Sequence, residues 1–544
     1  MKLKISLKRK VGKQDSSLNM PALLSSLMVP ILTVMLLVSC DISDFGDMNV
    51  DPTASTEMED RFQISTVQLG YTSNWQNAQK VKLRYASAIA QQTAHVVDAV
   101  GDHYRLNPEK ATRLWRNQYN QSWMSVRNVQ DIIHKLGELQ AEGEQVDNRL
   151  AVARIMRVFK FQRLTDVYGD LPYFEGGKGL VMGVTEPRYD PQQEVYNDML
   201  NELAEAVAQF DPGQSTYGSA DLVYGGDIGK WQRFGNSLRL RLAMRLVKVD
   251  PDRAREEAEA AVNAPGGVMT SNDDIWLMQH HSGPGTSPHE NPIAEHYSRD
   301  GGIYISQTMV NWMQDREDPR LRIYGAVVKG DEVITDLEQQ LGRPNGYPSS
   351  SELEAHPSWT GDVTDYTKLH PRFLDVENPS IWFTWAEVEF LQAEMEVRWG
   401  SSPLGAEEHY NNGVRAAMTY LANYSGDTDI SDTEIDDYLL NNPFNIAGSG
   451  NEQLEQINEQ YWAAVYMNGY EAWQNWKRTG YPALEPSPVD SPDPHPLSDT
   501  GGEPPRRLIY DPNEAVLNAA NYEEVINRQG PDLLTTRMWW DVAN

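Results

Sequence analysis

Cysteine and basic residues are scarce in this chain, and long apolar runs are confined to one place near its start. A single cysteine among 544 residues excludes a disulfide framework and a thiolate metal cluster. Lys and Arg number 47 against 78 Asp and Glu, so the net charge of −31 argues against nucleic-acid binding, which requires cations to neutralise phosphates. The 40% of apolar residues, with 15 Trp and 25 Tyr, suffice for a large folded core.

The first forty residues have the parts of a bacterial lipoprotein signal. Six basic residues in the first 13 precede the apolar run PALLSSLMVPILTVMLLV (21–38), and the lone cysteine, Cys40, comes two residues later. A basic start, an apolar run and a small residue before a break are typical of a secretory signal. The end of the run resembles a lipobox, which predicts a signal peptide at 1–39 and lipidation at Cys40. The alternative is a transmembrane anchor, because the run is nearly long enough to span a bilayer.

Residues 40–56 are polar and acidic, with Gly46 and Pro52, and predict an extended lipidated tether. Its acidic residues have two interpretations. They are either simple solubilising charge, or they resemble the signal that displays Bacteroidetes-type lipoproteins on the outer cell surface. The residues alone leave both interpretations open.

The rest of the chain, 57–544, is predicted to be one mainly α-helical domain. Val152, Ile155, Met156 and Phe159 have the i, i+3, i+4, i+7 spacing of an amphipathic helix. Similar apolar spacing recurs at 238–249, 388–399 and 454–465. Strand-like alternation is best at 302–306 and 321–328.

The predicted helices come in pairs, near 113–168, 191–249, 381–423 and 453–477. This pairing resembles tetratricopeptide-type helical hairpins, although the strict 34-residue consensus is absent. An ordinary helical domain without repeats is the alternative. Long irregular stretches lie between the pairs, at 211–230, 264–301, 329–380 and 479–512, and loops of this length are usually functional or disordered.

Several segments together resemble one known family. They are GDMNVDPT (46–53), RIMRVFKFQRLTDVYGDLPYFE (154–175), WQRFGNSLRLRLAMRL (231–246), DPRL (318–321), WAEVEFLQAEMEVRWG (385–400), YWAAVYMNGYEAWQNWKRTGYP (461–482), IYDPNEAVLNAANYEE (509–524) and RMWWDV (537–542). In order and spacing they resemble the SusD/RagB family of nutrient-binding outer-membrane lipoproteins, in its SusD-like branch.

The resemblance implies a fold of tetratricopeptide-like hairpins that support a loop-rich, ligand-binding face. It implies a lipid-anchored protein of the outer membrane that faces the cell exterior, binds oligosaccharides without catalysis and delivers them to a TonB-dependent, SusC-like transporter. A peptide or another nutrient is the alternative ligand in the same kind of uptake complex. A surface polysaccharide-degrading enzyme is the remaining alternative.

Most residues of these motifs have a structural interpretation. Gly169 is expected to end a helix in the left-handed C-cap conformation, and Pro172 then prevents the helix from continuing. Arg239, Arg241 and Arg245, on an otherwise apolar helix, are expected to pair with buried carboxylates. The tryptophans at 473, 476 and 540 are expected to pack between hairpins.

The chain shows no pattern of a cofactor site or of metal catalysis. Walker, GxSxG and dinucleotide motifs are absent. The histidine-rich loop 279–296 places His289 and His296 seven residues apart instead of the four that a zinc helix needs, and Pro292 between them argues against a helix. We therefore expect no cofactor, no bound metal and no enzymatic activity.

A sugar site needs aromatic faces and polar groups together on loops. Two loops meet that description, 98–105 and 271–300; Trp359, in a turn-like segment, is a third candidate, and Trp75 is a weaker one. We expect Tyr104, Trp276 and Trp359 to stack on the ligand. We expect Asp102, His281 and Asn291 to contact its hydroxyls.

Overall fold

The computed structural model describes residues 59–72, 78–97, 99–120, 123–283, 289–487 and 499–543. The predicted signal peptide, the lipidation site Cys40, the tether 40–56 and Trp75 lie outside these residues. Within the described residues, no helix is long and apolar enough to cross a membrane. The residues from 59 onward form one compact unit.

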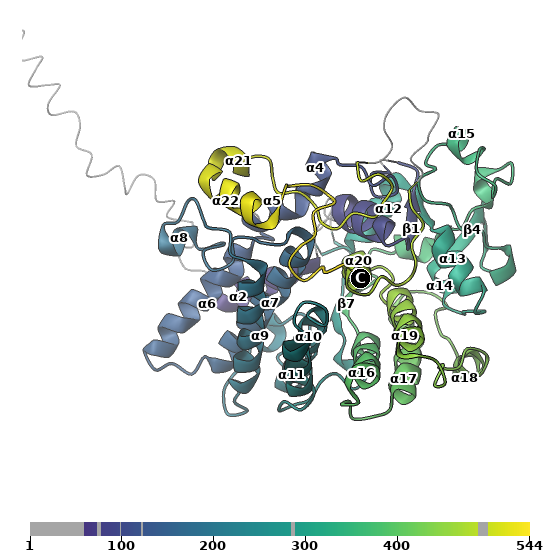
Figure 1. Ribbon diagram of the computed structural model, residues 1–544. Coiled ribbons are helices and arrows are strands. Elements are labelled where there is room, and N and C mark those ends of the chain that lie inside the picture. The colour runs from purple at the N-terminus through teal and green to yellow at the C-terminus, as the bar shows by residue number, and fades with distance from the viewer. Residues whose placement is uncertain are drawn as a thin grey trace, which may run out of the picture. The chain divides into compact units, whose positions relative to one another are not determined.

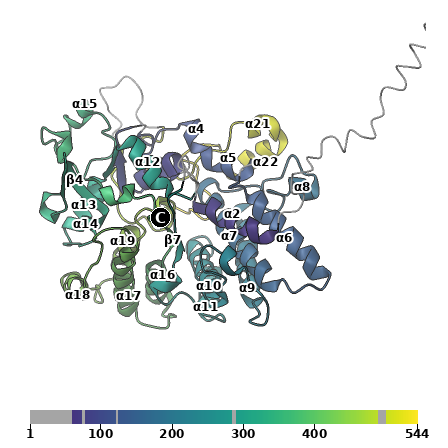
Figure 2. The ribbon, with the colours of Figure 1, turned by 180° about the vertical axis from the view of Figure 1, so that it is seen from behind.

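A row of paired helices forms one side of this unit (Figures 1 and 2). The row consists of α6 (Val126–Ala141), α7 (Asp147–Tyr168), α9 (Gln192–Ala208), α10 (Ile228–Arg245), α11 (Pro251–Val262), α16 (Trp385–Trp399), α17 (Ala406–Thr419), α19 (Gly450–Ala464) and α20 (Gly469–Thr479). Helix α7 packs against α6 and α9, α10 against α9, α11 and α16, and α16 against α17 and α19. The prediction of a mainly helical fold is confirmed.

Local sequence explains where these helices begin and end. The Thr384 hydroxyl accepts a hydrogen bond from the backbone N–H of Glu387, whose carboxylate accepts one from the N–H of Thr384, and this capping box starts α16. Gly400 ends it with a φ of 61°. Gly169 ends α7 with a positive φ of 85°, but its ψ of −129° lies outside the left-handed helical conformation that was expected. A Cβ there would collide with the side chain of Gln529.

The predicted charge pairing inside the row is confirmed. Arg239 pairs with Glu257 at 2.6 Å, Arg241 with Glu387 at 2.6 Å, and Arg245 with Glu471 at 2.6 Å. Of these pairs, the last two are almost completely buried and join side chains of α10 to Glu387 of α16 and Glu471 of α20. The tryptophans at 473, 476 and 540 are also buried, as expected.

Short strands and irregular segments cover the other side of the row. A five-stranded antiparallel sheet has the order β1 (Thr93–His95), β3 (Ile303–Ile305), β6 (Lys368–Leu369), β4 (Gly325–Lys329) and β5 (Glu332–Ile334). A separate pair joins β2 (Trp276–Met278) to β7 (Ser380–Phe383). The remaining helices are α2 (Asp60–Thr72), a π-helical segment (Ala78–Ser87), α4 (Pro108–Ala111), α5 (Arg113–Tyr119), α8 (Gly179–Met182), α12 (Pro292–Asp300), α13 (Gln307–Gln314), α14 (Leu321–Tyr324), α15 (Ser350–Leu353), α18 (Asp432–Asn441), α21 (Glu514–Leu517) and α22 (Ala519–Gln529).

Two local expectations need correction. The strand expected at 321–328 begins only at Gly325, because the buried Asp318 accepts a hydrogen bond from the backbone N–H of Arg320 and starts a helical turn there. Pro292 does not exclude a helix; it is the first residue of α12, where its missing N–H costs nothing and Asn291 caps the end.

Candidate ligand-binding site

A hollow of about 630 Å³ lies between α13, the 344–356 segment and the 482–487 segment. It is lined by Gln91, Tyr104, Gln307, Thr308, Asn311, Trp312, Asp315, Arg316, Pro344, Asn345, Tyr347, His356, Glu459, Pro482, Ala483, Glu485, Pro486 and Ser487. Eleven of these 18 residues carry polar or charged side chains, and the other seven are tyrosine, tryptophan, proline or alanine. We call it the α13 hollow.

Helix α13 supplies the polar wall because it is amphipathic. The Ser306 hydroxyl caps it by accepting from the N–H of Thr308. Thr308, Asn311 and Asp315 follow at helical spacing on one face, and the last two are exposed. Met309, Val310 and Met313 are buried. The helix is thereby fixed by its apolar face while its polar face lines the hollow.

A tryptophan, an arginine and a carboxylate form one corner. The indole N–H of Trp312 donates to Glu459 at 2.9 Å, and the Arg316 guanidinium pairs with the same oxygen at 2.8 Å. Arg316 also lies 4.3 Å from the centre of the Trp312 ring. Burial raises the pKa of Glu459, although both partners act against this. The three side chains hold each other in place.

A second set of bonds ties the 482–487 segment to the hollow. Gln91 donates to the Tyr104 hydroxyl at 3.2 Å and to the backbone carbonyl of Glu485 at 2.5 Å. Its own side-chain oxygen accepts from Thr308 at 2.6 Å. Tyr104, which was expected to stack on a ligand, is only 1% exposed, and its hydroxyl also donates to the Glu485 carbonyl. Tyr104 therefore lines the hollow without an open ring face.

Two half-buried rings of the 344–356 segment, Tyr347 and His356, also line the hollow, and we call them its rim. The rings of Tyr347 and His356 meet edge to face, with centroids 4.7 Å apart. Trp359, another expected stacking residue, is half-buried and packs with Tyr347 against a small cluster that contains Tyr366. Burial lowers the pKa of His356, which favours the neutral ring. The rim therefore offers partly open, uncharged aromatic surface.

Asp102 is not a lining residue of the α13 hollow but lies behind Asn345, which is one. Its Oδ1 atom accepts from the Asn345 side chain at 2.7 Å and from the backbone N–H of His95 at 3.2 Å. Burial raises the pKa of Asp102 to about 7, against the opposing effect of these hydrogen bonds and of Arg343. Asp102 orients Asn345, which does line the hollow.

The 271–300 loop does not reach the α13 hollow. Trp276 lies on β2, is 0% exposed, and packs against Tyr71 and Phe159, so no face of its ring is open to a ligand. Asn291 is buried, and its side chain caps α12 and donates to the backbone carbonyl of Asn378. His281 is exposed, and its backbone N–H donates to the carbonyl of His289. None of the three is among the lining residues.

Several residues of the hollow were not predicted from the sequence, notably Asn311, Trp312, Arg316, Tyr347 and Glu459. The segment RPNGYP around Tyr347 has the turn residues and the aromatic that marked the other candidates. Trp312 and Glu459 gave no such signal, because they lie on helices and 147 positions apart.

The described residues contain no cluster of three or more His, Cys, Asp or Glu side chains that could hold a metal ion. The hollow offers hydrogen-bonding amides, hydroxyls and carboxylates beside partly open rings. These groups suit a neutral ligand rich in hydroxyl groups.

Comparison with known proteins identifies the family. The SusD-like family model, described as "Starch-binding associating with outer membrane", matches residues 52–511. The chain belongs to the SusD-like family. Members are non-catalytic binding proteins, so this SusD-like protein is a binding protein and not an enzyme, and the family description associates it with the outer membrane.

Solved structures of SusD-like proteins share this fold. One, described as a "chitin-binding protein", has 30% identity and a TM-score of 0.76, with 89% of this chain and 100% of that chain covered. A Bacteroidetes SusD-like protein has 29% identity and a TM-score of 0.76, with the same coverage. A chitin-binding SusD homolog from Flavobacterium johnsoniae has 26% identity and a TM-score of 0.71, over 89% of this chain and 98% of that one. No curated protein matches the chain significantly in sequence.

Proposed function

We propose that this SusD-like protein binds oligosaccharides of N-acetylglucosamine in the α13 hollow. The observation that carries the proposal is that partly open rings and exposed polar side chains line the same hollow. The rings are Tyr347 and His356, and the polar side chains are Asn311 and Asp315. The 30% identity to a chitin-binding protein over 89% of the chain favours this sugar among the neutral ones.

The chemistry of the two walls fits a saccharide. Ring faces pack on the C–H-rich face of a pyranose, as aromatic anchors do in other binding sites. The amide of Asn311 can bond a sugar hydroxyl or an acetamido group, and the carboxylate of Asp315 accepts from hydroxyls. About 630 Å³ is within the usual size range of small-ligand sites, so it accommodates a short oligosaccharide.

Calorimetric titration with a chitin oligosaccharide, a cello-oligosaccharide and a malto-oligosaccharide of equal length tests the ligand class. We expect the chitin oligosaccharide to bind most tightly. Asn311→Ala should weaken it by about fivefold, the effect of one lost hydrogen bond. Asn201→Ala is the matched control, since Asn201 is also an exposed asparagine within a helix and does not line the hollow.

Two results would contradict the proposal. One is equal affinity of wild type and Asn311→Ala for every sugar that binds. The other is binding of peptides with no binding of any oligosaccharide, which would favour the peptide alternative. Released reducing ends are not expected from any of the sugars.

We further propose that Cys40 carries a lipid anchor, that the protein faces the cell exterior, and that it delivers its ligand to a TonB-dependent, SusC-like transporter. The lipobox-like end of the apolar run and the family description support anchoring at the outer membrane. Cys40→Ala should release folded protein from the membrane fraction. Purification in mild detergent should recover a β-barrel of transporter size with the wild type, and recovery of the protein alone would contradict the partnership.

A further inference from the structure

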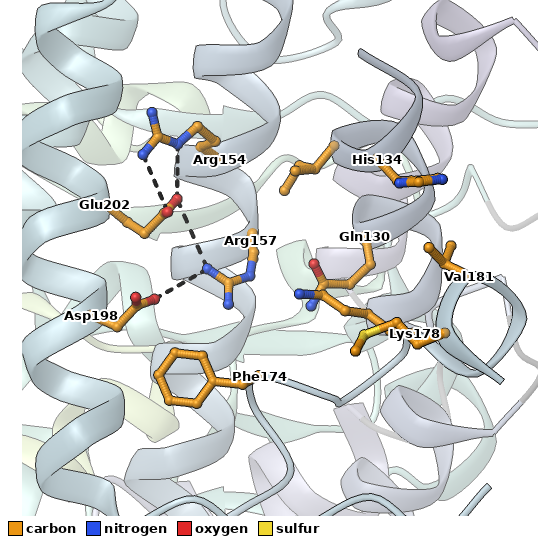
Figure 3. Close-up of a pocket in the computed structure, with 11 residues that line it drawn as sticks. Gln130, His134, Arg154, Arg157, Phe174, Lys178, Val181, Asp198 and Glu202 are labelled. Carbon is orange, nitrogen blue, oxygen red and sulfur yellow. Dashed lines mark hydrogen bonds and ion pairs between the residues drawn. The ribbon is translucent and has the colours of Figure 1, made fainter. Parts of the chain in front are cut away.

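A second hollow, of about 490 Å³, lies within the helical row, away from α13. Figure 3 shows Arg154 and Arg157 of α7 facing Asp198 and Glu202 of α9 on one side. Gln130 and His134 of α6 line the opposite side, together with Lys178 and Val181 of the segment that follows α7. We call this second hollow the α7 hollow.

Its three cations differ in how far they are neutralised. Arg154 binds Glu202 through two hydrogen bonds, at 2.9 and 3.2 Å, and pairs with Glu205 at 2.6 Å. Among the described residues, the carboxylate contacts of Arg157 are long, 3.4 Å to Asp198 and 3.9 Å to Glu202. Its main partner, Asp198, also accepts a closer hydrogen bond from the Tyr173 hydroxyl, at 2.6 Å. Arg157 is therefore buried with a weak counter-charge.

Lys178 has no carboxylate within ion-pair distance among the residues that the structure describes. It lines the α7 hollow and extends toward Gln130 in Figure 3. Partial burial and the nearby charge of Arg157 lower the pKa of Lys178. An anion placed between Lys178 and Arg157 would give Lys178 a charge partner and would add to the weak counter-charge of Arg157.

Apolar side chains also line the α7 hollow, and several of them are partly open. Phe174 is half-buried and presents its ring to the hollow, and Met182 and Val181 are 55% and 37% exposed. A simple inorganic anion would leave this surface in contact with water. A ligand with both a carboxylate and an apolar ring face would use the whole hollow.

We propose that the α7 hollow is a second binding site, specific for a saccharide residue that carries a carboxylate, such as a uronic acid. The carboxylate lies between Lys178 and Arg157, and the C–H face of the pyranose packs on Phe174. This inference rests on the proposed function only in taking the ligand to be a saccharide. It concerns residues that share no contact with the α13 hollow.

Methyl β-D-glucuronide and methyl β-D-glucoside form a matched pair of probes, because they differ only in the carboxylate. Titration of the protein should show binding of the glucuronide, at least tenfold weaker binding of the glucoside, and at least tenfold weaker binding of acetate. Lys178→Gln should weaken glucuronide binding about tenfold, as expected for loss of one charge-assisted hydrogen bond. Phe174→Leu should weaken the glucuronide but not acetate.

Lys230→Gln is the control, since Lys230 is a partly exposed lysine on α10 that does not line the hollow. Unchanged glucuronide affinity in Lys178→Gln would overturn the proposal, and so would equal affinities for glucuronide and glucoside. Acetate binding as tight as that of the glucuronide would overturn its saccharide part. Asn311→Ala should leave glucuronide affinity unchanged, so failure of the α13 site and failure of the α7 site are distinguishable.

Discussion

The centre of the helical row and the α13 hollow use polar side chains in opposite ways. In the row, four charged residues are at most 3% exposed and form ion pairs with one another: Arg241, Arg245, Glu387 and Glu471. Around α13, residues such as Asn311 and Asp315 are exposed on a helix whose apolar face is buried. Polar groups that are already bonded hold the helices in register, whereas groups left open can bind a ligand.

The pKa shifts of Glu387 and Glu471 show how strongly the buried charges of the row interact. Burial raises the pKa of Glu387. Burial also acts upward on Glu471, but the guanidinium groups of Arg245 and Arg241 bring its pKa below the ordinary value. Tyr461 joins the two carboxylates, because its hydroxyl lies 3.0 Å from Glu387 and 2.8 Å from Glu471. Side chains of α10, α16, α19 and α20 thus join in one network, and Arg245 also pairs with Asp166 of α7.

The largest expected effect follows from removing one charge of this network. Arg245→Met should lower the free energy of unfolding by about 3–5 kcal/mol, because Glu471 and Asp166 are left buried beside a neutral side chain. The midpoint of urea unfolding measures it. Arg255→Met, which breaks an exposed pair with Glu259 on α11, should cost about 0.5 kcal/mol or less. Equal losses in both variants would contradict the claim that the buried network, and not ion pairing in general, stabilises the row.

A smaller change to the same network is Tyr461→Phe. It removes one hydroxyl that bonds charged groups, so the free energy of unfolding should fall by about 1.5–3 kcal/mol, again measured in urea. Affinity for the glycan should not change, since Tyr461 is fully buried in the row. Tyr522→Phe is the control, with a partly buried hydroxyl 3.2 Å from Asp532, and it should cost less. A loss of glycan affinity in Tyr461→Phe would show that the two regions are coupled.

Behind the α13 hollow, stability should depend on pH through Asp102. Its pKa is raised to about 7 in the folded state, so between about pH 4 and pH 7 the folded protein binds more protons than the unfolded one, and stability falls as the pH rises. Asp102→Asn cannot ionise. Its stability relative to wild type should therefore rise from pH 5 to pH 8, by on the order of 2 kcal/mol.

Thermal unfolding at several pH values measures this difference between Asp102→Asn and wild type. Asp331→Asn, at an exposed turn between β4 and β5, is the control and should show no change with pH. A constant gap between Asp102→Asn and wild type over this pH range would mean that Asp102 is ionised throughout.

The row could be predicted from the sequence because its signals are local. Apolar residues recur at helical spacing, and the arginines at 239, 241 and 245 stand out in an apolar helix that packs against its neighbours. Pairing with carboxylates was therefore the one way to avoid buried unpaired charge. The partners could not be named, since Glu387 lies 146 positions from Arg241.

The site was less predictable because its residues come from distant segments. Tyr104 and Trp359 were chosen from loop composition, and the structure places one in the wall of the α13 hollow and the other beside its rim. Trp276 has the same kind of sequence context. However, β2 pairs with β7, about 100 residues later in the chain, and this pairing places the Trp276 side chain in the core. Only the strand partner distinguishes these cases, and no local pattern specifies it.

The smallest expected effect concerns the rim of the α13 hollow. Tyr347→Ala should weaken glycan binding by about 1 kcal/mol, or roughly fivefold in Kd. The effect is small because the ring is half-buried, and part of its surface already packs against His356 and the cluster that contains Tyr366. Tyr347→Phe keeps the ring and should bind nearly as well as wild type, since the proposed contact uses the ring face. Calorimetric titration measures both variants, and urea unfolding should show that neither is destabilised as strongly as Arg245→Met. If Tyr347→Phe lost as much affinity as Tyr347→Ala, the hydroxyl and not the ring would be the contact, and stacking at the rim would be wrong.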